Sequence, residues 1–208
     1  MIPQSGPRPE FKAGQVAILE MNGFGNVYIA FASAPYENEF EFLIKHNPAS
    51  AKVTSALFES RPDIQIVLKN IVGRSFSIED HRGNDIIFIA MGTGVAPLRS
   101  TLRHLLRSRY KYGRLVALYG ARREEDFCFA EEMATEWRER GVELRLVVSQ
   151  PSGDWSGPRG RVQSLLDHIA PDLKNPVALI CGSQAMIEQT RSHLLNLGLA
   201  PEKILTNF

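Results

Sequence analysis

The second part of the chain alternates strand-length apolar runs with helical segments, and this alternation constrains the fold more than any other feature. The runs lie at Ile86–Ala90, Leu115–Tyr119, Glu143–Val148, Val177–Cys181 and Ile204–Phe208. The segments between them have helical character and lie at Pro97–Arg109, Glu124–Arg140, Arg161–Ile169 and Gln184–Leu197. Strands that alternate with helices predict a doubly wound parallel sheet with helices on both faces. We assign this α/β domain to residues 84–208.

The first part of the chain has the pattern of an antiparallel β domain. Short β-prone runs lie at Val16–Leu19, Val27–Ala32, Glu39–Lys45, Ile64–Leu68 and Phe76–Ile78. The clearest is Glu39–Lys45, in which every second residue is apolar. One short helix is expected at Ser50–Glu59, and residues 1–10, with three prolines, are expected to form an extended arm. We therefore predict an antiparallel sheet or small barrel over residues 1–83.

Composition restricts the partners of the chain rather than its fold. The 208 residues carry a formal net charge of +1, so the charge balance favours neither nucleic acid nor an anionic membrane surface. The apolar runs are too short to span a bilayer, and no signal-peptide pattern opens the sequence. Cys128 and Cys181 form neither a metal-ligand spacing nor a disulfide framework. We therefore expect a cytoplasmic protein without a metal site or a nucleic-acid partner.

Residues that follow three of the predicted strands indicate a ligand site, because open α/β sheets bind ligands beyond the carboxyl ends of their strands. The clearest segment is Met91–Pro97, with the sequence Met-Gly-Thr-Gly-Val-Ala-Pro. Its glycines allow the backbone to approach a phosphate, and the helix that follows offers free N–H groups. A tight strand–helix turn without a ligand is the alternative. The ends at Tyr119–Arg123 and Cys181–Met186 are ambiguous, since arginines also suit a solvated helix start and a cysteine also suits the core.

Four motifs in order give the chain a resemblance to the ferredoxin–NADP reductase superfamily. IIFIAMGTGVAPLRS at 86–100 resembles the pyrophosphate loop of the family, and YGAR at 119–122 resembles its second strand end. VSQPSGDWSGPRGRV at 148–162 and CGSQAMI at 181–187 resemble the third and fourth motifs. The resemblance implies an NAD(P)H-binding α/β domain, with Cys181 as the catalytic residue beside the nicotinamide. It implies nucleotide contacts from Gly92, Thr93, Gly94, Val95, Pro97, Gly120, Arg122, Ser149, Gly182, Gln184 and Met186.

The resemblance extends, with gaps, to the flavin-binding barrel of the family. FKAGQVAIL at 11–19 and FEFLIK at 40–45 are similar to segments of that barrel, which in this chain is incomplete or closed by another chain. The flavin motif of the family, Arg-x-Tyr-Ser-x-Ala-Ser, places its arginine, tyrosine and first serine at Val27, Ile29 and Ala30. The charge, the ring and the hydroxyl are therefore absent. FAD contacts are expected from Phe31, Ala32, Ser33, Ala34, Pro35, Val53, Thr54, Ser55 and Phe208, the last of which is equally suited to filling a groove between the domains.

The resemblance implies an NAD(P)H-dependent flavoprotein oxidoreductase that passes hydride from nicotinamide to FAD and electrons to a partner or a small acceptor. Ser149 is followed by Gln150, where NADPH-specific relatives commonly have arginine, and this favours NADH. The degenerate flavin motif leaves two alternatives open: a flavin-free nucleotide-binding subunit of a larger complex, and a flavin reductase that uses flavin as a substrate.

A group of cations on and after the helix at 97–109 suggests a docking face for an acidic electron-transfer protein. The alternative is a solvated helix face whose cations lie near the C-terminus of the helix. Its members are Arg99, Arg103, Arg107, Arg109, Lys111 and Arg114.

Overall fold

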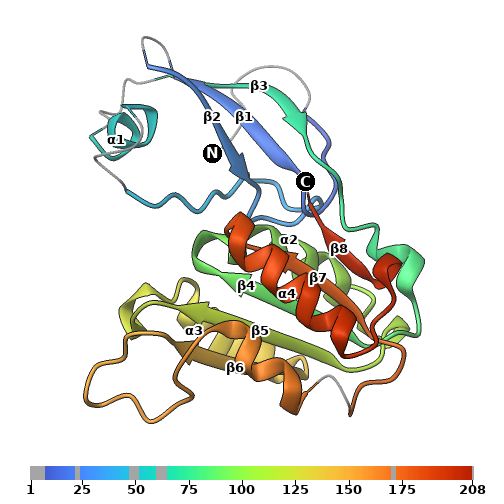
Figure 1. The fold of residues 1–208 in the computed structure, drawn as a ribbon. Helices are drawn as coiled ribbons and strands as arrows, with labels where there is room; N and C mark the ends of the chain where they lie inside the picture. Colours follow the sequence, from blue (N-terminus) through green and yellow to red (C-terminus); the bar gives the residue numbers. More distant parts are fainter. Residues whose placement is uncertain (1–7, 22–23, 47–51, 60–64, 170–171, 208) are drawn as a thin grey trace.

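A computed structural model of the chain describes residues 8–21, 24–46, 52–59, 65–169 and 172–207. It contains a small antiparallel sheet, at the top of Figure 1, and a larger parallel sheet below it. The antiparallel sheet comes first in the sequence. The predicted fold class, a β region followed by a doubly wound α/β region, is therefore confirmed.

Five parallel strands form the larger sheet, in the order β6-β5-β4-β7-β8. They are β4 (Ile86–Met91), β5 (Leu115–Ala121), β6 (Val142–Val148), β7 (Val177–Cys181) and β8 (Ile204–Thr206). Every residue of β5 and β7 is buried, which explains why these strands are unbroken apolar runs. The strand order reverses at β4, so the carboxyl ends of β4 and β7 border the crevice in which such sheets bind ligands.

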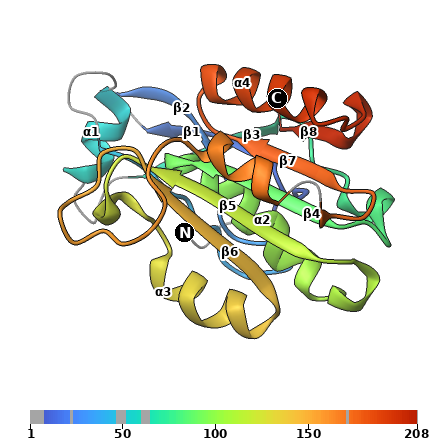
Figure 2. The ribbon, with the colours of Figure 1, turned by 60° about the horizontal axis from the view of Figure 1, so that its bottom comes forward.

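Helices cover both faces of the parallel sheet, as Figure 2 shows. One face carries α2 (Val95–Leu106) and a second helix, formed by α3 (Ala130–Glu132) and a π-helical turn (Met133–Trp137). The opposite face carries a 3₁₀ segment (Val162–His168) and α4 (Gln184–Asn196). The apolar side predicted for the first helix is confirmed, since the sheet buries Leu98, Leu102, Leu105 and Leu106.

The helix predicted over Glu124–Arg140 is interrupted. A 3₁₀ turn covers Glu124–Asp126, and helical structure begins again only at Ala130. Between them Phe129 has a left-handed backbone, with φ of 59°, and its ring centroid lies 4.4 Å from the guanidinium carbon of Arg99 on α2. The contact between Phe129 and Arg99 therefore determines the backbone at this point, in place of the continuous helix that the local pattern predicts.

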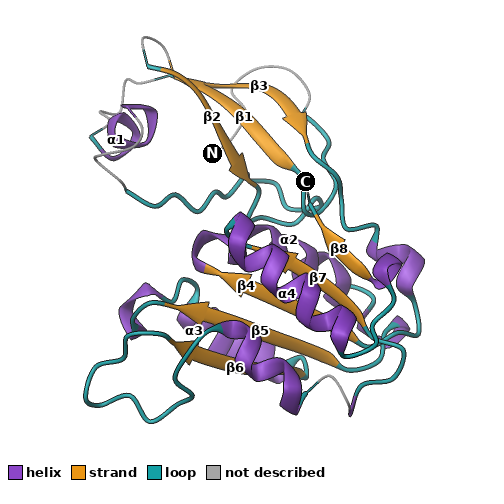
Figure 3. Cartoon of the chain, in the orientation of Figure 1, coloured by secondary structure: helices purple, strands orange, loops and turns teal. Residues whose placement is uncertain are grey.

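The smaller sheet has the antiparallel order β2-β1-β3. Its strands are β1 (Val16–Met21), β2 (Gly25–Ala30) and β3 (Ile66–Val72), and α1 (Lys52–Phe58) contacts β2 (Figure 3). Aromatic rings form much of its core. Phe11 stacks on Phe31 with ring centroids 3.9 Å apart, and Phe40 packs against both rings.

The strand predicted at Glu39–Lys45 is wrong. This segment makes a single isolated bridge, between Phe31 and Phe42. The Glu41 backbone bonds to the loop after β2 instead, because its N–H donates to the hydroxyl of Ser33 at 3.1 Å. The alternating apolar residues therefore identify the buried side of this segment, although the segment does not pair as a strand in the sheet.

The strand predicted at Phe76–Ile78 is also wrong. Ser77 has a left-handed φ of 43°, and a 3₁₀ turn (Ile78–His81) follows it directly. Phe76 and Ile78 are both buried in the core of the parallel sheet, at 1% and 2% exposure. The chain bends at Ser77 because these two side chains pack into the core of the parallel sheet.

Buried polar contacts join the two sheets at two places. Arg99 on α2 donates from Nη1 to the carbonyl of Ala32 at 2.8 Å and to Oε2 of Glu41 at 2.6 Å. Asn207, which follows β8, donates from Nδ2 to the carbonyl of Gly14 at 3.0 Å. Both side chains come from the α/β domain, so its ligand crevice has a fixed position relative to the β domain.

Candidate functional site

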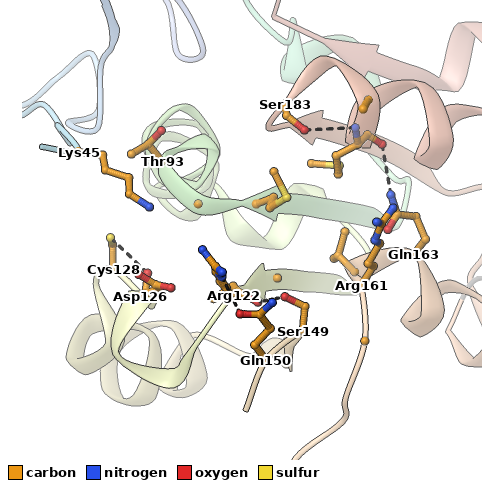
Figure 4. Close-up of a pocket in the computed structure, with 18 of the residues that line it drawn as sticks. Lys45, Thr93, Arg122, Asp126, Cys128, Ser149, Gln150, Arg161, Gln163 and Ser183 are labelled. Carbon is orange, nitrogen blue, oxygen red and sulfur yellow. Dashed lines mark hydrogen bonds between the residues drawn. The ribbon is translucent and has the colours of Figure 1, made fainter. Parts of the chain in front are cut away.

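A cleft of about 650 Å³ opens at the carboxyl ends of β4, β5 and β6. Figure 4 shows the residues that surround it. One wall comes from the β domain, through Leu43–Lys45, and the others come from loops after the strands and from the start of α4. Its volume is within the usual range for a cofactor site.

The glycine loop contributes two of its predicted residues to the cleft. Gly92 has a left-handed φ of 55°, with open space where a side chain would lie, and both Gly92 and Thr93 line the cleft. Gly94 faces β7 instead, because a Cβ there would lie 2.6 Å from the carbonyl carbon of Cys181. Gly94 therefore allows the turn between β4 and α2 to pass close to the end of β7. The first turn of α2 buries the other two predicted residues, Val95 and Pro97.

The ends of β5 and β6 bring three predicted residues to the cleft, Gly120, Arg122 and Ser149. Arg122 donates from Nε to Oε1 of Gln150 at 2.7 Å, and this bond holds its guanidinium at the cleft (Figure 4). A Cβ at Gly120 would lie 3.2 Å from Cβ of Val162, so this glycine allows the 3₁₀ segment Val162–His168 to pack against β5.

The end of β7 leads directly into α4. Ser183 caps this helix, because its hydroxyl accepts a hydrogen bond from the Met186 N–H at 3.3 Å. Met186 lines the cleft, as predicted, whereas Gly182 and Gln184 do not. Gln184 bonds to Glu188 one turn further along the helix, at 2.7 Å.

Cys181, the predicted catalytic residue, lies behind the cleft rather than in its wall. It is 5% exposed, and Sγ donates to Oδ1 of Asn207 at 3.5 Å. Burial raises the pKa of the Cys181 thiol to about 12, so the group stays neutral at physiological pH. This environment suits a packing and hydrogen-bonding role and opposes a thiolate nucleophile.

Sequence reasoning missed several residues of the cleft wall. Lys45 closes the segment FEFLIK and Arg161 lies in the motif at 148–162, so both had a usable signal. Cys128 had none, because its position depends on the interruption before α3. Lys45 and Arg161 add positive charge to the cleft, to which Arg122 already contributes.

The expected flavin contacts are buried within the β domain. Phe31, Ala32, Ser33 and Ala34 are each 0% exposed, and none lines the large cleft. Pro35 lines a separate cavity of about 340 Å³. The last of these residues lie on α1 or beyond the described part of the chain: Val53, Thr54 and Ser55 belong to α1, and Phe208 lies outside the described residues.

Three of the six cations in the predicted docking group are paired within the chain. Arg99 is buried, and Arg103 pairs with Glu37, with Nε and Oε1 2.9 Å apart. Arg114 forms two hydrogen bonds with Glu143, at 2.9 and 3.0 Å. The other three, Arg107, Arg109 and Lys111, contact aromatic rings or backbone carbonyls. The docking face therefore stays a prediction.

Among the described residues, no helix has both the length and the apolar character of a membrane span. These residues also contain no group of three or more histidine, cysteine, aspartate or glutamate side chains placed to hold a metal ion.

The fold and the cleft together define a class of protein: a doubly wound dinucleotide-binding domain attached to an antiparallel β domain. The sequence profile of the oxidoreductase NAD-binding domain matches residues 88–192. The chain is 30% identical to the gamma subunit of sulfhydrogenase 2 from Pyrococcus furiosus, across 93% of this chain and 70% of that subunit.

Two further proteins to which the chain is similar are ferredoxin reductases by name. The ferredoxin–NAD(P)(+) reductase component of the naphthalene 1,2-dioxygenase system from Pseudomonas putida is 28% identical, and the match covers 94% of this chain and 59% of that component. The crystal structure of a ferredoxin NADP+ reductase from Neisseria gonorrhoeae with bound FAD and NADP has a TM-score of 0.79 and 24% identity, covering 96% of this chain and 88% of that one. The chain belongs to the ferredoxin–NADP reductase superfamily of NAD(P)H-dependent oxidoreductases.

Proposed function

We propose that this chain oxidises a reduced nicotinamide dinucleotide in the 650 Å³ cleft and passes the electrons, through FAD, to a partner protein. The observation that carries the proposal is the position of the cleft, at the carboxyl ends of β4 to β6 with a wall from the β domain. The reductase component from Pseudomonas putida supports an electron-transfer role. We retain the division of the chain at about residue 83 as part of this proposal.

The residues of the cleft fit a dinucleotide. Gly92 leaves room for a phosphate group to approach the backbone, and Thr93 adds a hydroxyl. Arg122 and Arg161 supply positive charge for phosphates, and Met186 supplies an apolar surface. Cys181 supports the cleft from behind through its hydrogen bond to Asn207.

A flavin would depend on other contacts than the usual motif supplies. Val27, Ile29 and Ala30 offer neither charge nor hydroxyl, and Ile29 is buried in the core. The wall at Leu43–Lys45 combines apolar side chains with an exposed cation, which fits an aromatic ring and its phosphate tail. When bound, flavin supplies the step from two-electron to one-electron transfer. This chain would position it, with the two domains joined by Arg99 and Asn207.

The absorption spectrum of the purified protein tests the flavin part of this proposal. A yellow protein that NADH bleaches under anaerobic conditions supports it. A colourless protein that reduces added flavin indicates the flavin reductase alternative, and one that binds NADH without either reaction indicates the flavin-free subunit. The missing flavin motif is the observation that keeps these two alternatives in view.

A matched pair of arginine variants tests the nucleotide part. Arg114 and Arg122 flank the two ends of β5, but only Arg122 lies at the cleft. Arg122→Gln should weaken NADH or NADPH binding by at least about tenfold, because a hydrogen bond to a charged group contributes roughly 1.5–3 kcal/mol. Arg114→Gln should leave the Kd unchanged. Titration of both variants with NADH and with NADPH also decides which nucleotide is preferred; equal affinities for Arg122→Gln and the unmodified protein would contradict the proposed site.

A further inference from the structure

Tyr119 on β5 lies beneath the cleft without lining it. The residue is 1% exposed, and its ring packs edge-on against Phe127, with centroids 5.1 Å apart. The ring therefore belongs to the core of the α/β domain. Only the hydroxyl reaches the loops that form the cleft.

The hydroxyl of Tyr119 bridges two of these loops. It donates to the carbonyl oxygen of Gly92 at 3.0 Å and accepts from the N–H of Cys128 at 3.3 Å. Gly92 follows β4 and Cys128 follows β5, and both line the cleft. In Figure 4, Thr93 and Cys128 lie one above the other on the same side of the opening. A phenol can donate one hydrogen bond and accept another, so a single oxygen holds both loops.

The bond to Gly92 also fixes the peptide unit that follows it. Because a trans peptide is planar, with its C=O and N–H pointing in opposite directions, holding the Gly92 carbonyl also fixes the direction of the Thr93 N–H. Glycine moves easily between left- and right-handed backbone states, so the φ of 55° at Gly92 needs an external constraint to persist. Tyr119 supplies one, and burial raises its pKa, so the donor proton is retained at neutral pH.

We propose that Tyr119 is a positioning residue for the nucleotide: its hydroxyl holds the loops after β4 and β5 at the separation and orientation that the dinucleotide needs. The inference rests on the proposed function, since it takes the 650 Å³ cleft as the nucleotide site. Its energetic basis is preorganisation. A loop that is already ordered loses less conformational freedom when the nucleotide binds.

The test is Tyr119→Phe, which keeps the ring and removes only the bridging oxygen. Tyr112→Phe is the matched control, because Tyr112 is buried in the same core and donates to the Ile78 carbonyl at 3.3 Å, and neither residue lines the cleft. Each variant is titrated with NADH and NADPH, and its unfolding in urea and the exchange of the Cys128 amide proton are measured. Where turnover is present, kcat and KM are determined separately.

Tyr119→Phe should raise the Kd of the preferred nucleotide about tenfold and speed exchange of the Cys128 amide, with KM raised and kcat retained, because no reacting atom is touched. Tyr112→Phe should lower stability by a similar amount and leave the Kd unchanged. A Kd for Tyr119→Phe within twofold of the unmodified protein, or unchanged exchange at Cys128, overturns the inference while leaving the proposed function intact. Failure of the unmodified protein to bind either nucleotide overturns the proposed function and the inference with it.

Discussion

Replacement of Arg99 by methionine should weaken the contact between the two domains. The Arg99 side chain is 5% exposed and is surrounded by acceptors from both domains. Nε donates to Oε2 of Glu132 at 2.7 Å, and Nη1 donates to Glu41 and to the carbonyl of Ala32. Methionine fills much of the same volume without any donor, so the change isolates the polar contacts.

The size of the effect follows from the exposure of the partners. The Glu132 side chain is 16% exposed, so removing Arg99 leaves a poorly hydrated charge whose remaining cation, Arg103, has its Nη1 4.0 Å away; breaking a fully buried pair costs about 3–5 kcal/mol. The Glu41 side chain is 48% exposed and can recover water, so its loss contributes at most about 1 kcal/mol. We expect Arg99→Met to lower the free energy of unfolding by about 3 kcal/mol.

Urea unfolding followed by tryptophan fluorescence measures this effect. Glu132→Gln in the Arg99→Met background should recover about 1–2 kcal/mol, because it removes the poorly hydrated charge while keeping an acceptor for the Trp137 indole N–H, which lies 3.0 Å from Oε1 in the unmodified protein. Arg114→Met is the control, since that pair is exposed and is expected to contribute less than about 1 kcal/mol. A loss below 1 kcal/mol for Arg99→Met, or one equal to that of the control, would refute the argument that the buried Arg99–Glu132 pair stabilises the chain.

Three further predictions concern single positions. Gly94→Ala should lower the free energy of unfolding by about 2–3 kcal/mol, because its Cβ would lie against the Cys181 backbone. Gly92→Ala should cost roughly 1 kcal/mol, because only its left-handed φ is strained. Thermal unfolding of both variants checks this ranking, and the reverse order would contradict it. The Cys181 thiol has a pKa of about 12 in the folded chain against an ordinary value of 9.0, so the unfolded chain releases the proton first and stability should fall by about 1.4 kcal/mol per pH unit between pH 9.0 and pH 12. Below pH 9 the effect is absent. Cys181→Ser should remove that part of the slope in urea titrations across this range, and an unchanged slope would exclude the assigned environment. Asp85→Asn should lower the free energy of unfolding by about 1–3 kcal/mol, because both carboxylate oxygens accept backbone N–H groups at 2.7 Å and an amide has only one such oxygen. Chemical unfolding measures this loss, and a neutral result would show that other groups can replace these hydrogen bonds.

The parallel sheet could be predicted because its strands are buried on both faces. Runs such as Ile86–Ala90 are then uniformly apolar, and the loops after them fall at one edge of the sheet by topology. The same rule predicts a ligand site at the loops that carry Gly92 and Arg122, and both residues line the cleft, whereas Ser149 is expected only from the family resemblance. The antiparallel part was less predictable, because Glu39–Lys45 has the alternation of a strand yet bonds to a loop.

The direction in which a loop residue faces could not be predicted. Gly92 and Gly94 are identical in type and two positions apart, yet one faces the cleft and the other faces β7. Arg99 has the sequence pattern of a surface cation, but its partners Ala32 and Glu41 lie 67 and 58 residues away. Such contacts exist only once the two domains have met, so no local pattern records them.

The position of Asn207 has a consequence for the order of events during protein synthesis. Its side chain bonds to Gly14, 193 positions earlier, and its carbonyl accepts from the N–H of Arg74 at 3.3 Å. The β domain is synthesised long before residue 207, so until that residue is made Gly14 and Arg74 lack their hydrogen bonds to Asn207. The contacts of Asn207 therefore form only after the intervening α/β domain has been made, and a nascent chain that stalls before residue 207 lacks them.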